Sequence, residues 1–176
     1  YGVWAHDPSG QGTAGLDGAY DFCDRDAMIA GDPDAVALIE SFFSPSQSFP
    51  AYLSSSFSGT FEMQFDPALA YTHRSRYLER VGFRGAVTGR INGNELNNTF
   101  LGGDLGDEFE GRGGNDKIEG DLGLDEAFFS GPSTDYTIVP LDATVTRVTD
   151  TVPGRDGVDD VRQITRLHFS DVIIDL

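Results

Sequence analysis

The sequence predicts an all-β fold with one short helix, and three observations lead to this prediction. A nine-residue motif repeats four times between Gly93 and Phe128, and its glycine density excludes helix there. Strand-like segments, in which apolar residues alternate with polar ones or β-branched residues gather, flank the repeat on both sides. Only the stretch from Asp32 to Phe43 has apolar residues at helical spacing behind a helix-start signal.

Residues 1–90 are expected to form an N-terminal segment of mixed structure. Residues 1–31 are rich in glycine, aspartate and serine and should be irregular. Asp32 is expected to cap the short helix, with Pro33 at its first position. From Phe57 to Phe65 apolar and polar residues alternate, which predicts a strand with one buried face. We expect this β structure to cap the repeats that follow, because the terminal turns of a repeat array need covering.

The four copies of the repeat align without gaps. The first position is glycine in every copy: Gly93, Gly102, Gly111 and Gly120. The sixth position is Asn98, Asp107, Asp116 and Asp125, and the eighth is Phe100, Phe109, Ile118 and Ala127. A fixed period over four copies indicates a repeat architecture and not four unrelated turns. Each copy therefore predicts a glycine turn and a short strand, with the apolar eighth residue in the core.

Residues 129–176 are expected to be rich in β structure. Two strands, at 135–139 and 143–148, are separated by Pro140 and should form a hairpin or meander. The segment 158–169 places Val161, Ile164 and Leu167 on one face, and a last strand is expected at 172–176. This region therefore predicts a β-rich cap at the end of the repeats.

The turns of the repeat contain the oxygen ligands that calcium prefers. Glycine accepts positive φ without strain and leaves backbone carbonyls free to point inward, and aspartate adds a carboxylate. Calcium takes six to eight hard oxygen ligands in loose geometry. A stack of such turns therefore predicts calcium binding.

The repeat resembles the glycine- and aspartate-rich nonapeptide G-G-x-G-x-D-x-U-x of RTX (hemolysin-type) calcium-binding proteins. After the repeats, Asp-Tyr-Thr-Ile at 135–138 and Phe-Ser-Asp at 169–171 resemble the C-terminal flank that follows many RTX repeats. The resemblance covers about residues 91–176, roughly half of the chain. It implies a short parallel β-roll at 91–128, a β-rich cap with a secretion-signal region at 129–176, and type I export from a bacterium into the extracellular space.

The resemblance also implies which residues bind the ions. In a β-roll, copies eighteen residues apart are vertical neighbours, so Ca²⁺ sites are expected between Asn98 and Asp116 and between Asp107 and Asp125. Backbone carbonyls near six turn residues should complete the shells: Gly102, Asp104, Gly111, Gly113, Gly120 and Leu122.

Asn98 and Leu105 depart from the family pattern. Asn98 replaces the aspartate of the sixth position, which removes one negative charge and should weaken that site. Leu105 stands at a glycine position, and the neighbouring Gly106 is expected to take the strained backbone conformation in its place.

The net charge of −17, from 29 acidic and 12 basic residues, argues against nucleic acid or an anionic membrane surface as a partner. Divalent cations are the natural counter-charge. Without ions, repulsion among clustered carboxylates should keep the repeats poorly folded, so that ion binding and folding are coupled.

Further features fit a secreted protein stabilised by calcium. Cys23 is the single cysteine, which excludes an intrachain disulfide. No stretch approaches the roughly twenty apolar residues of a membrane span, and no signal peptide is visible at Tyr1. Because the chain does not begin with methionine, we expect a processed product or a piece of a longer protein.

The sequence identifies no catalytic residues. Neither the H-E-x-x-H zinc motif nor the G-x-S-x-G nucleophile elbow occurs, and His6, His73 and His168 are far apart along the chain. Three roles stay open. The chain is a calcium-binding module of a secreted protein, the C-terminal part of an RTX-type hydrolase with catalytic residues upstream, or an extracellular structural or accessory subunit that docks on a larger assembly through residues 1–90.

Overall fold

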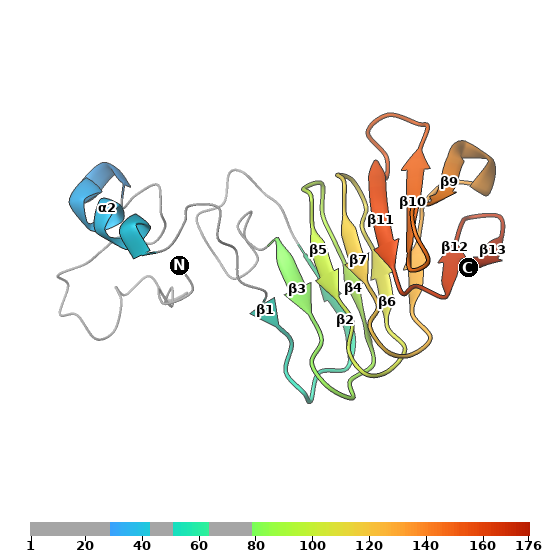
Figure 1. The fold of residues 1–176 in the computed structure, drawn as a ribbon, viewed down its shortest axis with the longest axis horizontal. Coiled ribbons are helices and arrows are strands. Elements are labelled where there is room, and N and C mark those ends of the chain that lie inside the picture. Colours follow the sequence, from blue (N-terminus) through green and yellow to red (C-terminus); the bar gives the residue numbers. More distant parts are fainter. Residues whose placement is uncertain (1–28, 43–50, 64–78) are drawn as a thin grey trace. The chain divides into compact units, whose positions relative to one another are not determined.

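The computed structural model describes residues 29–42, 51–63 and 79–176 of the chain (Figure 1). The chain divides into two compact units, residues 1–48 with 66–77 and residues 49–65 with 78–176. The described part of the first unit contains helix α2 (Pro33–Phe42), and residues 29–31 before it are also helical, so the expectation that residues 1–31 are irregular is wrong at its C-terminal end. Asp32 Oδ1 accepts a hydrogen bond of 2.9 Å from the Ala35 amide, so the predicted N-cap and the proline at the first helical position are both confirmed.

Two sheets of short, mostly parallel strands make up the second unit (Figure 1). The first sheet, in spatial order, contains β1 (Ala51–Tyr52), β3 (Arg80–Gly82), β5 (Thr99–Leu101), β7 (Lys117–Glu119), β11 (Val158–Arg162), β10 (Val145–Asp150) and β9 (Tyr136–Pro140). The second contains β13 (Ile173–Asp175), β12 (Arg166–His168), β8 (Glu126–Phe128), β6 (Glu108–Glu110), β4 (Gly89–Asn92) and β2 (Gly59–Glu62). From β1 to β8, successive strands alternate between the two sheets, and the predicted all-β character is confirmed.

The parallel register follows the nine-residue period. Phe100 on β5 pairs with Ile118 on β7, and Phe109 on β6 pairs with Ala127 on β8, so copies eighteen residues apart are neighbours, as expected. The parallel pairing also continues past the four copies. Strands β2 and β3, which precede residue 91, lie in the same two sheets, and β11 and β12 extend the sheets on the far side of β7 and β8.

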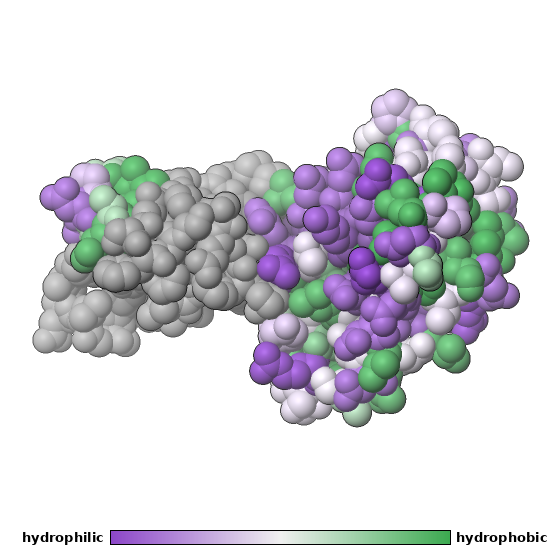
Figure 2. All heavy atoms as spheres, viewed as in Figure 1, coloured by the Kyte–Doolittle hydropathy of each residue, from purple (hydrophilic) through white to green (hydrophobic). Residues whose placement is uncertain are grey.

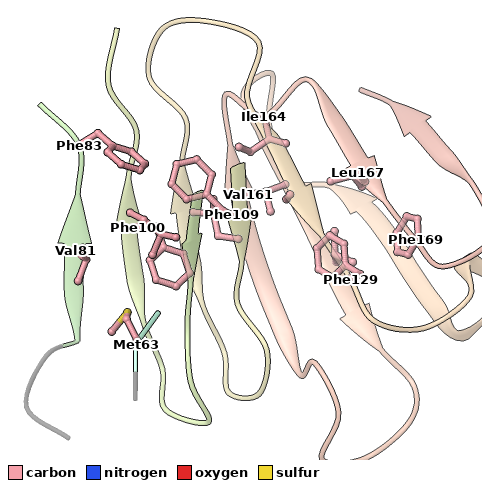
Figure 3. Close-up of a cluster of buried hydrophobic side chains, with 14 of the residues drawn as sticks. Met63, Val81, Phe83, Phe100, Phe109, Phe129, Val161, Ile164, Leu167 and Phe169 are labelled. Carbon is pink, nitrogen blue, oxygen red and sulfur yellow. The ribbon is translucent and has the colours of Figure 1, made fainter. Parts of the chain in front are cut away.

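The core lies between the two sheets (Figure 3). All four residues at the eighth repeat position are buried there: Phe100, Phe109, Ile118 and Ala127. The Phe100 and Phe109 rings stack with centroids 6.0 Å apart. Fully burying such a side chain contributes about 1.5–3 kcal/mol. Residues outside the repeat continue the same core in both directions, and these include Val81, Ile91, Val161 and Leu167.

The C-terminal region forms a meander and then returns to the parallel sheets. After the 3₁₀ turn η1 (Ser133–Asp135), β9, β10 and β11 pair antiparallel, which confirms the predicted hairpin, although Pro140 lies inside β9 and not between two strands. The segment 158–169 is not a single element. Gln163, with φ of 52°, turns the chain from β11 in one sheet to β12 in the other, while Val161, Ile164 and Leu167 all stay buried.

The surface of the second unit is mainly hydrophilic along the parallel strands (Figure 2). Hydrophobic residues gather toward β9 and β13, where Val139 and Ile173 are exposed. Among the residues that the structure describes, no helix is long and apolar enough to cross a membrane.

Candidate cation site in the repeat turns

The turns that connect the strands stack along two edges of the sheets. Turns 93–98 and 111–116 form the first edge, and turns 102–107 and 120–125 form the second. The side chain at the sixth position of each turn is almost completely buried, with exposures of 1% for Asn98, 0% for Asp107, 1% for Asp116 and 0% for Asp125. Aspartate is rarely buried to this degree unless its charge is compensated.

Each edge brings together the two residues that the sequence pairs. The backbone amide of Asn98 donates to Asp116 Oδ1 at 2.7 Å, and the amide of Asp107 donates to Asp125 Oδ1 at 2.8 Å. The carboxylates of Asp116 and Asp125 therefore reach back from their own turns to the preceding turn on the same edge. Both side chains therefore join one turn to the next.

The second oxygen of each of these carboxylates has no partner. Asp116 Oδ2 and Asp125 Oδ2 are buried and accept no hydrogen bond in the structure. By contrast, Asp107 accepts hydrogen bonds on both oxygens, from the amides of Gly103 and Gly89. A buried, unsatisfied carboxylate oxygen costs free energy and calls for a donor, a proton or a cation.

Asn98 is satisfied in a different way. Its Oδ1 accepts from the Asn94 amide at 3.0 Å, and its Nδ2 donates to Asn94 Oδ1 at 3.1 Å. This neutral pair stands where the second edge has the Asp107 carboxylate. Of the two side chains between turns 93–98 and 111–116, only Asp116 therefore contributes a negative charge.

The first-position glycines leave room for these carboxylates. A Cβ at Gly120 would lie 2.6 Å from Asp125 Oδ2, and one at Gly111 would overlap Asp116 Oδ2. A Cβ at Gly102 would overlap the carbonyl oxygen of Gly120, and the glycines at 93 and 111 are related in the same way. The invariant glycine of the repeat is thus explained by close stacking of carboxylate and carbonyl oxygens.

Turn 102–107 has a different backbone conformation from the two turns that follow it. In turns 111–116 and 120–125 the fourth-position glycines, Gly114 and Gly123, have φ of 106° and 119°. Neither Leu105 nor Gly106 has positive φ, so the expectation that Gly106 takes the strained conformation is wrong. Gly106 is needed for another reason, because a Cβ there would lie 2.7 Å from the carbonyl oxygen of Leu124.

The expected carbonyl donors all lie in these stacked turns. Gly102, Gly111 and Gly120 occupy the first position, and Gly111 and Gly120 are buried beside the carboxylates of Asp116 and Asp125. Asp104, Gly113 and Leu122 occupy the third position, where Asp104 and Leu122 are exposed and Gly113 is half-buried. The amides of Asp104 and Leu122 donate to carbonyls of the preceding turn on the same edge, at Gly85 and Gly103.

Burial raises the pKa of these aspartates. The pKa of Asp116 is raised to about 7, mainly by burial, with a further contribution from the charge of Asp156. The pKa of Asp125 is raised to about 6 by burial and by the charges of Asp107 and Asp121, and burial also raises that of Asp107. Backbone hydrogen bonds oppose each shift without cancelling it. Without a counter-cation, these carboxyl groups retain protons at pH values where exposed aspartates are ionised.

The oxygen atoms of these residues are suitable ligands for a hard cation. Within the described ranges, no three acidic, cysteine or histidine side chains converge on one point. A cation at these turns would therefore take most of its ligands from backbone carbonyls, with a carboxylate oxygen from Asp116 or Asp125. Neutral carbonyls combined with few carboxylates suit a hard cation such as calcium and not zinc or copper, which prefer nitrogen or sulfur ligands.

The structure adds one residue that sequence reasoning missed. Asp159 is 1% exposed, and its Oδ1 accepts a hydrogen bond of 2.8 Å from the Asp116 amide, so it continues the first edge beyond Asp116. The residues from Gly154 to Arg162 read G-R-D-G-V-D-D-V-R, with glycine at positions one and four, aspartate at six and valine at eight. This pattern is the sequence signal that could have identified Asp159. Its glycine and aspartate positions are out of phase with the nine-residue period of the four contiguous copies.

The described histidine has a packing role. His168 Nε2 lies 2.7 Å from Glu126 Oε2, and its ring stacks on Phe128 with centroids 4.3 Å apart. His6 and His73 lie outside the described residues.

No family model matches the chain, and no curated protein matches it in sequence.

Proposed function

We propose that the repeats form a calcium-binding β-roll of the RTX type, which folds around Ca²⁺ and stabilises a secreted protein outside the cell. The observation that carries this proposal is the pair of buried, unpartnered oxygens, Asp116 Oδ2 and Asp125 Oδ2. Each belongs to a carboxylate that already bridges two turns of one edge. A cation between the turns would satisfy the oxygen and compensate the buried charge.

Two sites follow from the pairing of the turns. One lies between turns 93–98 and 111–116, with Asp116 as the charged ligand, and the other lies between turns 102–107 and 120–125, with Asp107 and Asp125. First- and third-position carbonyls supply the remaining oxygens. When bound, the ion provides the positive charge that the turns lack, while the residues themselves fix the spacing of the strands.

The expected affinity is modest. Because most ligands are neutral carbonyls, Kd values of about 10⁻⁴ to 10⁻³ M, as in other extracellular modules, are appropriate. Calcium is scarce inside cells and abundant outside them. A chain that stays poorly folded without calcium would remain suited to export and would fold once outside, which supports type I secretion as the route.

Calcium titration followed by far-UV circular dichroism tests this proposal. We expect β signal to rise with Ca²⁺ in the millimolar range and to fall again on addition of EGTA. With Ca²⁺ at about 100 times Kd, each site should add about 2.7 kcal/mol to the free energy of unfolding. Mg²⁺ at the same concentration should have a much smaller effect, because it demands stricter octahedral geometry.

Asp175→Asn is the matched control, because Asp175 is exposed on β13 and far along the chain from the repeats. This variant should keep the calcium response of the native chain. A β signal and an unfolding midpoint that ignore both Ca²⁺ and EGTA would contradict the proposal.

A further inference from the structure

Turn 154–159 stacks on turn 111–116 although 43 residues separate their sixth positions. The Asp116 amide donates to Asp159 Oδ1 at 2.8 Å, and the Val158 amide donates to Asn115 Oδ1 at 3.0 Å. A Cβ at Gly157 would overlap the Gly114 carbonyl oxygen, so the two turns are in close contact at their fourth positions as well. The chain thus leaves the parallel sheets after β8, forms the β9–β10 hairpin, and returns to the same edge.

Asp159 repeats the arrangement of Asp116 and Asp125. It is 1% exposed, and its Oδ1 bridges to the preceding turn of the edge. The side chain is therefore a buried carboxylate that is directed at turn 111–116, where Asp116 Oδ2 is buried and has no partner.

The protein's own cations do not compensate this carboxylate. The Arg155 guanidinium is bound to Asp150 and Asp135, and that of Arg147 is bound to Asp160. Asp116 and Asp156 add negative charge near Asp159, although Asp156 is itself satisfied by Tyr136 and Ser130. The space between the two turns therefore has buried negative charge, carbonyl oxygens and no compensating side chain among the described residues.

We propose that the space between turns 111–116 and 154–159 binds a third calcium ion, with Asp159 and Asp116 as its carboxylate ligands. This inference rests on the proposed calcium-binding function and extends it to a turn outside the contiguous repeats. The ion would attach the hairpin to the parallel sheets, because turn 154–159 directly follows β10. Calcium would then hold the C-terminal region as well as the repeats.

Native mass spectrometry of the full chain in volatile buffer with calcium acetate tests this by counting bound ions. The native chain should bind three Ca²⁺ ions, and the isosteric variants Asp159→Asn and Asp125→Asn should each bind one fewer. Asp160→Asn is the matched control, because it removes the same charge from the neighbouring residue, whose carboxylate is half-buried and bound to Arg147. It should bind as many ions as the native chain.

Hydrogen exchange of the native chain gives a test that needs no variant. The amides of Asp116 and Asp160 donate across the contact between the two turns. Both should exchange at least about tenfold more slowly with Ca²⁺ than with EGTA. This protection should disappear in Asp159→Asn and persist at the Asp160 amide in Asp125→Asn.

The outcomes separate the two proposals. If neither the native chain nor any variant binds Ca²⁺, the proposed function fails. If Asp125→Asn loses an ion while Asp159→Asn keeps the native number and its Asp160 amide stays protected, only the third site is wrong. Calcium-independent exchange at the Asp116 and Asp160 amides in a chain that binds Ca²⁺ elsewhere would also overturn the third site alone.

Discussion

The repeat turns and the hairpin junction, formed by Tyr136, Asp150, Arg155 and Asp156, both bury aspartates. The two regions compensate the charge of these aspartates differently. In the repeat turns, Asp116 and Asp125 each keep an unpartnered oxygen. At the hairpin junction, the Asp150 side chain is completely buried and accepts two hydrogen bonds of 2.7 Å from the Arg155 guanidinium. Asp156 nearby accepts from Ser130 and from the Tyr136 hydroxyl.

The difference shows that the repeat turns, and not the hairpin junction, lack a counter-charge of their own. The hairpin junction contains its own counter-charge, and the Arg155 guanidinium also lies over the Tyr136 ring, with 5.0 Å between them. Among the described residues, no arginine or lysine forms an ion pair with the sixth-position carboxylates of the repeat turns. The internal contacts of the junction should therefore persist with or without calcium, whereas the repeat turns, and the docking of turn 154–159 on them, should depend on the ion.

The largest expected effect is a pH dependence of opposite sign in the two regions. Folding raises the pKa of Asp116 to about 7 and of Asp125 to about 6, so their contribution to stability is present below about pH 4 and is lost as pH rises through 6–7. Burial alone would raise the pKa of Asp150, but hydrogen bonds from Arg155 and two amides lower it overall, so its contribution is lost only in acid. Metal-depleted protein should therefore have more β signal near pH 5 than at pH 8.

Circular dichroism from pH 4.5 to 8 checks this, on protein freed of metal by chelating resin. Saturating Ca²⁺ should abolish the loss of β signal between pH 6 and 8. Identical pH profiles with and without Ca²⁺ would contradict the assignment of the repeat aspartates as the calcium-dependent group.

Asp125→Asn should change stability in opposite directions with and without calcium. With Ca²⁺ at about 100 times Kd, losing one site should lower the free energy of unfolding by about 2.7 kcal/mol. In EGTA at pH 8 the variant should be more stable than the native chain, because it removes a buried charge with an unpaired oxygen. Urea unfolding in both conditions measures this, and a loss of equal size in both would mean that Asp125 has only a structural role.

Tyr136→Phe should weaken the hairpin junction by the same amount in both conditions. The Tyr136 hydroxyl donates to Asp156 and accepts from the Gly131 amide, so its removal leaves two buried groups short of a partner. We expect a loss of about 1–3 kcal/mol. Tyr52→Phe is the control, because Tyr52 is exposed on β1. A loss seen only with calcium would show that the junction depends on the ion.

Asn98→Asp should make the first edge resemble the second. It replaces the neutral Asn94–Asn98 pair with a second carboxylate opposite Asp116. The first site should bind Ca²⁺ about tenfold more tightly, which corresponds to about 1.4 kcal/mol. Isothermal titration calorimetry measures the change. Unchanged affinity would place the ion away from Asn98.

The sequence predicts the repeat turns well because their pattern is local. A period of nine residues, with glycine at the first position and Phe100, Phe109 and Ile118 at the eighth, predicts a turn and a short strand in each copy. The pairing of residues eighteen apart was implied by the resemblance to the RTX nonapeptide. The helix start at Asp32 is predicted for the same reason, since capping depends on neighbours in sequence.

Other features could not be predicted because they depend on residues distant in sequence. After strand β3, Arg84 stands where the repeat has its first-position glycine, and β3 joins its sheet by pairing Val81 with Phe100. Asp159 is recognisable as a residue of the stacked turns only once the structure shows that the hairpin returns the chain to the first edge. At Gly106 the prediction failed because close packing against Leu124, and not positive φ, requires the glycine.

The return of the chain at turn 154–159 also has a consequence for the order of folding. Adding a contiguous repeat closes a loop of 18 residues, whereas the contact between Asp116 and Asp159 closes one of 43. By loop-closure entropy the second costs about 0.8 kcal/mol more. Folding should therefore proceed as a zipper through the contiguous turns, and the hairpin region should dock last, as a separate kinetic phase.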